Sequence, residues 1–355
     1  MDLNNGIINK NDKFNQFKSI NKFENLKSNY ILQKIFYDLQ RKTYLEIIKY
    51  NKQIQKRLDI NIKDYKEYSE VYSSIEIDII PSNLLGKFIK FKEKDKKYYH
   101  IYFNNNTKES QKNYFGKNIE IEVKKIKIII DYQIKSFRDL FYRCECIESI
   151  SFEKFYRNNI DNMASMFAEC SSLKEINLSN FNTCNVINMS GMFCGCSKLE
   201  KINLTKFSTN KVKDMSFMFC RCYSLKEINV TNFNTNNVTN IKYMFNECSN
   251  LKEINFSNFN TNNVTEMGGM FNQCFSLKEI DLSNFETKKV TYMNHMFNEC
   301  TSLKEVNISN FDFSNIIDMH AMFSGCSKEI KEKVRAQIKD KNIREGFVEE
   351  MFLYF

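Results

Sequence analysis

The sequence predicts an α/β fold built as a solenoid, in which one short coil of chain is repeated and stacked on its neighbours. Methionine recurs every 26 residues from Met163 to Met319, with Ile241 filling the single gap. A Met-Phe pair follows three residues after each of these positions. Within one repeat the apolar spacing changes from two-residue alternation to steps of three and four, the periods of a strand and of a helical face.

The repeats span 137–327, with seven full copies over 137–318 and a partial eighth from Met319. In one copy the alternation runs through Leu173, Ile176 and Leu178, and the helical spacing runs over 186–196. A single copy cannot bury its apolar side, but stacked copies share a continuous core. We therefore expect a parallel strand ladder plus short helices.

The repeat unit "MSGMFCGCSKLEKINLTKFSTNKVKD" (189–214) resembles the BspA-like leucine-rich repeats of bacterial surface proteins and of many protists. The resemblance covers about half of the chain. It implies a curved leucine-rich-repeat solenoid that binds proteins, and it implies no catalytic residues.

The remaining segments are predicted to flank the solenoid. A solenoid needs caps because its end coils would otherwise expose core to water. After the repeats, Ser327 is a suitable N-cap for a helix whose Ile330, Val334 and Ile338 share one face. We expect a polar, flexible tail (1–28), a helical segment (29–70), a β-rich unit with strands at 73–82, 97–105 and 119–132 (71–136), and a C-terminal capping helix and tail (328–355). The solenoid is thus preceded by a small α+β region.

The helical segment has a run of apolar residues that resembles the first helix of an F-box. The resemblance implies that this run binds a Skp-type linker of a ubiquitin ligase. The alternative is a plain helical N-terminal domain. The candidate linker-binding residues are Ile31, Leu32, Ile35, Phe36 and Leu39.

The charge distribution excludes a nucleic-acid function for the repeats. Residues 1–136 hold 27 Lys and Arg against 17 Asp and Glu, whereas the rest of the chain holds 25 against 26. Phosphate binding needs clustered cations, which the repeats lack.

The longest apolar run, Ile128-Ile129-Ile130, is too short to span a membrane. Without a secretory signal at the start of the sequence, we expect a cytoplasmic protein.

Eight cysteines also recur every 26 residues, from Cys144 to Cys326. Stacked singly, they cannot converge on a metal as zinc ligands do, so we interpret them as core thiols. Cys194-x-Cys196 and Cys220-x-Cys222 come closest to a cluster, but alternate residues tend to face opposite sides.

The sequence shows no catalytic triad, phosphate loop or paired carboxylates. We therefore expect no enzymatic activity, no cofactor and no metal.

The candidate binding residues alternate with the apolar residues of the predicted strands and should point away from the core. They recur as columns of Glu, Asn or Asp, and Ser or Thr. We expect them to bind a protein ligand on the concave face. A scaffold of this kind is the predicted function; the alternatives are an F-box-like substrate adaptor and a cell-surface adhesin. The residues are Glu175, Asn177, Ser179, Asn203, Glu227, Asn229, Glu253, Asn255, Ser257, Glu279, Asp281, Glu305 and Asn307.

Overall fold

The computed structural model describes residue 23 and residues 26–37, 41–116 and 122–353. The chain divides into two compact units, Met1–Ser73 (unit 1) and Ser74–Phe355 (unit 2). The predicted tail at 1–28 lies largely outside the described residues. No helix in the described ranges is long and apolar enough to cross a membrane.

Unit 1 is helical. Side chains from three of its helices meet in a small core formed by Leu32, Phe36, Ile48 and Ile54. The side chain of Asn51 caps one helix through the N–H of Ile54, at 2.9 Å. The helices are α2 (Asn29–Tyr37), α3 (Arg41–Ile48), α4 (Lys52–Arg57) and α5 (Ile62–Tyr72).

Unit 2 begins with a five-stranded sheet whose strand order is β3-β5-β1-β6-β7. The first four strands pair antiparallel, whereas β6 and β7 pair in parallel. The strand β6 is therefore both the last antiparallel strand and the first strand of the repeats. The large strands are β1 (Ile75–Pro81), β3 (Tyr99–Phe103), β5 (Ile126–Ile130), β6 (Ile147–Lys154) and β7 (Glu175–Asn177).

The strands β1, β3 and β5 lie within the three stretches for which alternation predicts strands. A two-stranded ribbon and one 3-10 helix complete this part of unit 2. They are β2 (Gly86–Lys87) with β4 (Tyr114–Phe115), and η1 (Glu93–Tyr98).

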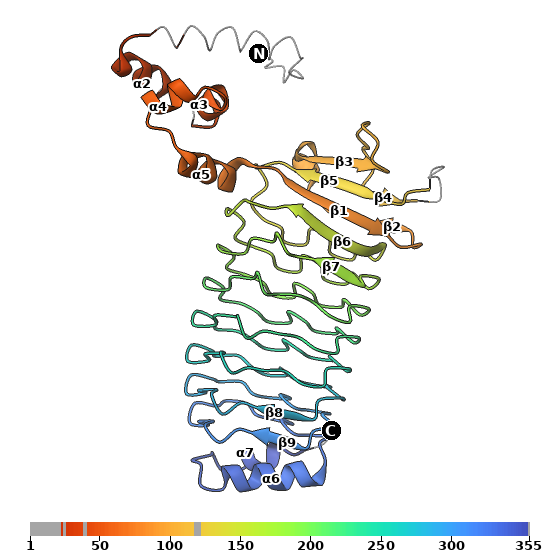
Figure 1. Cartoon of the computed structure of the whole chain (residues 1–355). Coiled ribbons are helices and arrows are strands. Elements are labelled where there is room, and N and C mark those ends of the chain that lie inside the picture. The colour runs from red at the N-terminus through yellow and green to blue at the C-terminus, as the bar shows by residue number, and fades with distance from the viewer. Residues whose placement is uncertain (1–22, 24–25, 38–40, 117–121, 354–355) are drawn as a thin grey trace. The chain divides into compact units, whose positions relative to one another are not determined.

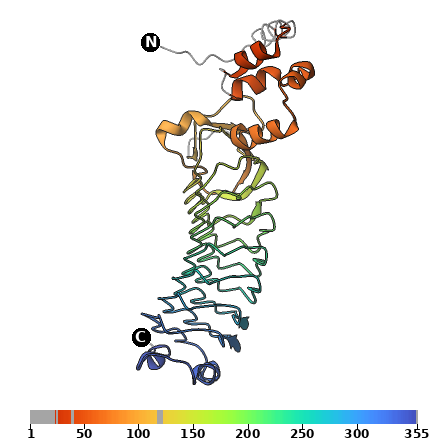
Figure 2. The same cartoon turned by 90° about the vertical axis from the view of Figure 1, so that its left-hand side faces the viewer.

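The repeats form a stack of coils, which Figure 1 shows face-on and Figure 2 shows edge-on. Parallel bridges join equivalent residues of consecutive coils, from Ser136–Asn162 to Tyr292–Asp318. We name residues 162–170 and their equivalents in the other coils the turn face. Residues 174–179 and their equivalents are the strand face, which carries β7, β8 (Glu279–Asp281) and β9 (Glu305–Asn307). A repeat architecture is therefore present in unit 2.

The short helices predicted within the repeats are absent from the described residues, and the turn face consists of successive turns instead. The N–H groups of Met166, Ala168 and Cys170 each bond to the carbonyl three residues earlier, at 3.1–3.2 Å. The N–H groups of the intervening residues donate to the next coil instead, as Ser165 N does to Ser190 O at 2.8 Å. In an α-helix every N–H after the first turn bonds to the carbonyl four residues earlier, so alternate N–H groups would not be left to join the coils. Ser165, at φ 53°, has the left-handed backbone that such a turn requires.

In the middle of the stack, backbone hydrogen bonds between coils are longer on the strand face than on the turn face. On the strand face Lys252 N and Lys226 O are 3.4 Å apart, whereas on the turn face Phe245 N and Met270 O are 2.9 Å apart. The continuous ladder on the turn face holds the coils together there. Only β7, β8 and β9 form regular strands among the described repeats after β6.

The core of the stack consists of columns of identical residues. Phenylalanine rings stack with centroids 5.1–6.0 Å apart from Phe141 to Phe323. The eight cysteines of the predicted ladder are all buried, and the sulfur of Cys248 donates to the carbonyl of Phe219 in the preceding coil at 3.1 Å. Six other ladder cysteines donate to the equivalent carbonyl. Burial raises the pKa of these thiols, as for Cys274, whose pKa is about 12. These thiols are core groups.

A buried threonine column fastens each coil to the next. Thr235 Oγ1 donates to the carbonyl of Asn260 at 2.9 Å and accepts from the N–H of Asn260 at 2.7 Å. Thr183, Thr209, Thr261 and Thr287 are buried in equivalent positions. One hydroxyl thus satisfies two backbone groups of the neighbouring coil.

We expect Thr235→Val to destabilise unit 2 by about 1–3 kcal/mol, because valine keeps the shape but leaves both backbone groups of Asn260 without this partner. Urea denaturation followed by circular dichroism measures the change. The control is Thr265→Val, whose exposed hydroxyl bonds to the carbonyl of Thr239 at 3.2 Å. Equal effects of the two substitutions would show that the buried column does not stabilise the stack.

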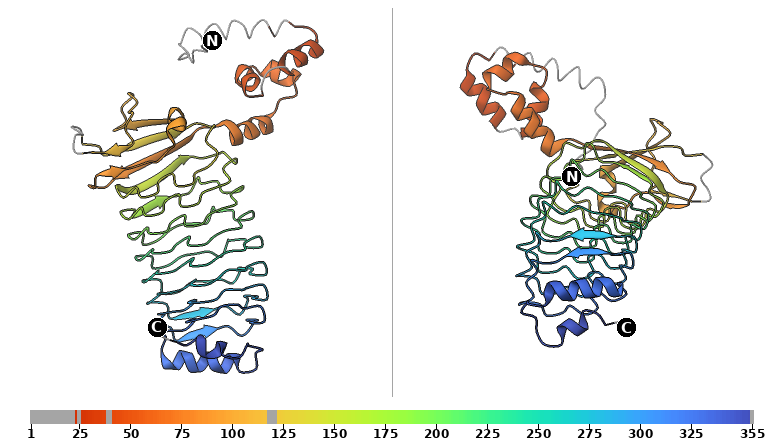
Figure 3. Two further views of the ribbon diagram at one scale, coloured as in Figure 1. Left: turned by 180° about the vertical axis from the view of Figure 1, so that it is seen from behind. Right: turned by 60° about the horizontal axis from the view of Figure 1, so that its bottom comes forward.

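Two helices follow the last coil, and both contact it (Figure 3). The first, α6 (Lys328–Ile338), starts at the N-cap Ser327 and buries Ile330, Val334 and Ile338. Its Gln337 amide donates to the carbonyl of Val306 at 2.7 Å and accepts from the N–H of Ile308 at 2.9 Å. The second helix is α7 (Phe347–Glu350). The carbonyls of Glu350 and Met351 accept from the N–H groups of Ala321 and Phe323, and they continue the turn-face ladder in this way.

Candidate functional site

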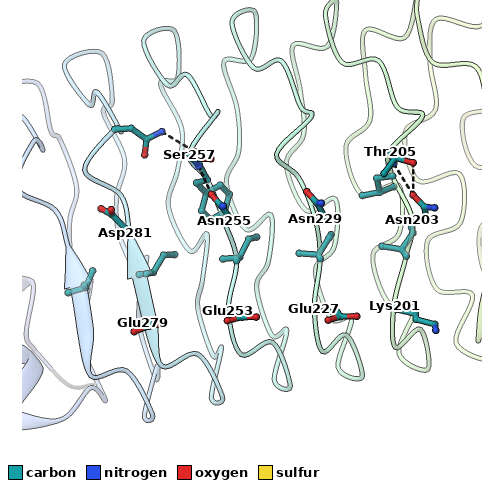
Figure 4. Close-up of a pocket in the computed structure, with 18 of the residues that line it drawn as sticks. Lys201, Asn203, Thr205, Glu227, Asn229, Glu253, Asn255, Ser257, Glu279 and Asp281 are labelled. Carbon is teal, nitrogen blue, oxygen red and sulfur yellow. Dashed lines mark hydrogen bonds between the residues drawn. The ribbon is translucent and has the colours of Figure 1, made fainter.

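The predicted binding residues line one face of unit 2, as Figure 4 shows for the middle coils. Their side chains are exposed, except that Asn307 is half-buried. The alternating residues Ile228, Ile254 and Ile280 are buried beneath them. The two-residue alternation therefore places these columns correctly, although regular strands form in few coils.

Most residues of the asparagine column have a structural role, and the sequence pattern alone did not distinguish this role from ligand binding. Asn255 Oδ1 accepts the backbone N–H of Ser257 at 2.8 Å. The same turn forms at Asn177, Asn203, Asn229, Asp281 and Asn307. It holds the bend that ends each strand segment. The side-chain oxygen of each of these residues therefore already accepts a hydrogen bond, from the backbone N–H of the Ser or Thr two residues later. This bond lowers the pKa of Asp281.

A groove of about 1680 Å³ runs along the strand face across six coils. The carboxylates of Glu227, Glu253 and Glu279 line it, and so does Gln337 of α6. Its floor holds isoleucines such as Ile254. The groove offers carboxylate and amide groups around an apolar floor.

A lysine column lies beside the glutamate column, and sequence reasoning missed it as part of the site. If the two-residue alternation extended to the residue before each exposed glutamate, that residue would be buried. The residues at these positions are exposed, because they precede the strand segment and the alternation does not reach them; they are Lys226, Lys252, Lys278 and Lys304. The repeated Lys-Glu pair in the sequence was the available signal. A furrow of about 580 Å³, here the charged furrow, is lined by these four lysines and Glu227, Glu253, Glu279 and Glu305.

The sign pattern of this column changes along the stack. In the early coils positive and negative residues alternate, and they pair: Lys174 with Glu148 at 2.8 Å, and Lys226 with Glu200 at 2.6 Å. The contact with Lys226 lowers the pKa of Glu200. From Lys226 onward the column is lysine only, and the neighbouring column from Glu227 onward is glutamate only. Among the described residues, Lys252, Lys278, Lys304, Glu227, Glu253 and Glu279 have no ion pair within 4.0 Å.

The candidate linker-binding residues of α2 divide between the core of unit 1 and its surface. Leu32 and Phe36 are buried in that core, so they are not presented to a partner in this structure. Ile31 is exposed and Ile35 is half-buried. Leu39 lies outside the described residues.

The described residues contain no group of three or more His, Cys, Asp or Glu that could hold a metal ion. Of the three histidines, His295 and His320 lie in adjacent coils with ring centroids 5.6 Å apart. Desolvation and the neighbouring His320 lower the pKa of His295.

Comparison with known proteins points to one family. The model described as "Mycoplasma protein of unknown function, DUF285" matches residues 135–229 and 223–336, which together make up more than half of the chain. No curated protein matches. Among solved structures, a leucine-rich repeat protein from Bacteroides ovatus is similar at 16% identity, with a TM-score of 0.21. The similarity covers 56% of this chain and 65% of that protein.

Proposed function

Because the chain belongs to the family described as Mycoplasma protein of unknown function, DUF285, whose match coincides with the coil stack, we propose a function from the geometry of that stack. The protein is a non-enzymatic scaffold that binds a protein ligand on the strand face. The observation that supports this best is the charged furrow along the edge of the groove. The glutamate column is the wall that the groove and the furrow share.

The charged furrow favours a protein partner with charges of both signs. Like charges that lie directly opposite one another on neighbouring strands repel. In the last four coils the lysines are stacked on lysines and the glutamates on glutamates. A partner with basic groups facing the glutamates and acidic groups facing the lysines would relieve both repulsions. A nucleic acid carries only one sign of charge and would face the glutamate wall.

The proposal also assigns α6 the role of a cap that closes a leucine-rich-repeat solenoid. The Gln337 amide bonds to the backbone of β9 as a following strand would, and the apolar face of α6 covers the last coil. A cap of this kind protects the end of a stack from water and from pairing with other chains.

The test reverses two charges in the middle of the shared wall. We expect Glu253→Lys with Glu279→Lys to weaken ligand binding by roughly 2–5 kcal/mol, since both attractive contacts become repulsive. Quantitative affinity purification from the source cell, at low and high salt, measures the loss. Binding by the native protein should weaken as salt rises.

The matched control is Glu286→Lys with Glu345→Lys, two exposed residues that line neither the groove nor the furrow. It changes the net charge by the same amount. If both double variants keep the same partners, the strand face is not the binding surface.

The adaptor alternative remains a separate prediction. On α2 the exposed apolar side chains are those of Tyr30, Ile31 and Tyr37, and these are the groups that could meet a Skp-type linker. Recovery of such a partner with the native protein, and its loss with Ile31→Asp, would support the adaptor. A substitution at the buried Phe36 would disrupt the core of unit 1 and would not test it.

A further inference from the structure

Two cysteines occupy equivalent positions in neighbouring coils outside the core ladder. Cys194 and Cys220 lie on the turn face, each two residues before a ladder cysteine. Cys194 is half-buried, and Cys220 is 4% exposed. Each thiol shifts the pKa of the other, so the two side chains lie close together. They therefore form a pair, unlike the ladder cysteines, which bond to carbonyl groups.

The coil spacing at this point suits a disulfide. The N–H of Gly195 donates to the carbonyl of Cys220 at 2.7 Å, so the two backbones are directly joined. The adjacent rings of Phe193 and Phe219 stack with centroids 5.6 Å apart. Hydrogen-bonded neighbouring strands lie about 4.8 Å apart, which is within the roughly 4.4–6.8 Å between Cα atoms that a disulfide needs.

The pair terminates a ladder of asparagine amides. Asn298 Nδ2 donates to Asn272 Oδ1 at 2.8 Å, and Asn272 Nδ2 donates to Asn246 Oδ1 at 2.6 Å. Asn246 Nδ2 in turn donates to the sulfur of Cys220 at 3.3 Å. At Cys220 a sulfur takes the place of the next amide oxygen. The Cys220 sulfur therefore accepts from the Asn246 amide of the following coil, and Cys194 is the equivalent residue of the preceding coil.

These neighbouring groups stabilise a negative charge on Cys220. The neighbouring thiol of Cys194 lowers the pKa of Cys220 most, and the Asn246 amide and the positive charge of Arg221 add to this effect against desolvation. The neighbouring Cys220 sulfur and burial raise the pKa of Cys194. Arg221 lies between Glu169 and Glu247, at 3.7 and 3.6 Å. A thiolate next to a partner thiol is the arrangement of a reactive cysteine pair.

We propose that Cys194 and Cys220 form a peroxide-sensitive site that closes to a reversible disulfide between two coils. The Cys220 thiolate attacks one oxygen of hydrogen peroxide, the O–O bond breaks, and hydroxide leaves and takes a proton to become water. Cys220 is then a sulfenic acid. The sulfur of Cys194 attacks the Cys220 sulfur, the S–O bond breaks, and the oxygen leaves as a second water with the thiol proton. Two thiols lose two electrons, and one peroxide is reduced to two waters.

The experiment treats the full-length protein with hydrogen peroxide, blocks the remaining thiols and digests with trypsin. Cleavage after Lys213 and Arg221 isolates Cys220 from Cys222, so a link to Cys220 is unambiguous. The partner peptide holds Cys184, Cys194 and Cys196. We expect a linked peptide in the native protein and in Cys184→Ser, its loss in Cys194→Ser, and its reversal by dithiothreitol. In Cys194→Ser, Cys220 should instead be labelled by a sulfenic-acid reagent.

The surface variant Arg221→Gln keeps the test independent of core folding. It removes one charge that favours the thiolate, so disulfide formation should slow several-fold while the circular dichroism spectrum is unchanged. Oxidation spread evenly over Cys184, Cys194 and the ladder cysteines would overturn the proposal. So would a folded protein in which Cys220 stays reduced at peroxide concentrations that oxidise Cys184. The site lies on the turn face, so its failure would not bear on binding at the strand face.

Discussion

Replacing Phe245 by alanine is expected to destabilise unit 2 by about 3–5 kcal/mol, the range for removing a fully buried phenylalanine. The ring is 0% exposed and lies between Phe219 and Phe271, with centroids at 5.4 and 6.0 Å. It also contacts Phe256 edge-on at 6.0 Å. Alanine would leave a cavity in the middle of the stack, where each coil is supported only by its two neighbours.

The midpoint of urea denaturation, followed by circular dichroism, measures this effect. The matched control is Phe275→Ala, in which the same atoms are removed from a side chain that is 39% exposed. We expect a change within about 0.5 kcal/mol there. Similar losses at Phe245 and Phe275 would mean that the stacked column does not carry the stability of the repeats.

Replacing Arg157 by methionine is expected to destabilise unit 2 by about 2–4 kcal/mol, because two backbone carbonyls would lose their donors. The side chain is 0% exposed, and its Nη1 and Nη2 atoms donate to the carbonyls of Asp131 and Ile134 at 2.8 and 2.7 Å. It joins the segment after β5 to the first coil. Burial lowers the pKa of Arg157 to about 10, so its charge carries a desolvation cost. Methionine removes that cost as well, which keeps the expected loss moderate.

The control for this substitution is Arg138→Met, since Arg138 is 64% exposed and pairs with Asp139 at the surface. Surface pairs of this kind contribute little to stability. The variant Arg157→Lys separates charge from geometry, because one ammonium nitrogen cannot occupy both nitrogen positions of the guanidinium fork. If Arg157→Lys matched the native protein in urea denaturation, the charge and not the fork would be the stabilising feature.

Much of unit 2 could be predicted because the period is strict. A residue that returns every 26 positions meets the same surroundings in every coil. The burial of the cysteine ladder and the exposure of Glu253 and Asn255 therefore follow from the pattern alone. The N-terminal segment lacks this redundancy. The resemblance to an F-box implies that the apolar run of α2 binds a partner, whereas a plain helical domain is the alternative; Leu32 and Phe36 lie within the core of unit 1.

The sequence by itself determined the repeat, its period, the residues that face the core and the column of glutamates on the strand face. Only the tertiary structure decided that the turn segments are not helices, because steps of three and four residues fit both a helix and a series of turns. Hydrogen bonds to a coil about 25 residues away, such as Ser165 N to Ser190 O, make that choice. The same long-range stacking turns the lysine column outward and places Cys194 and Cys220 in neighbouring, hydrogen-bonded coils.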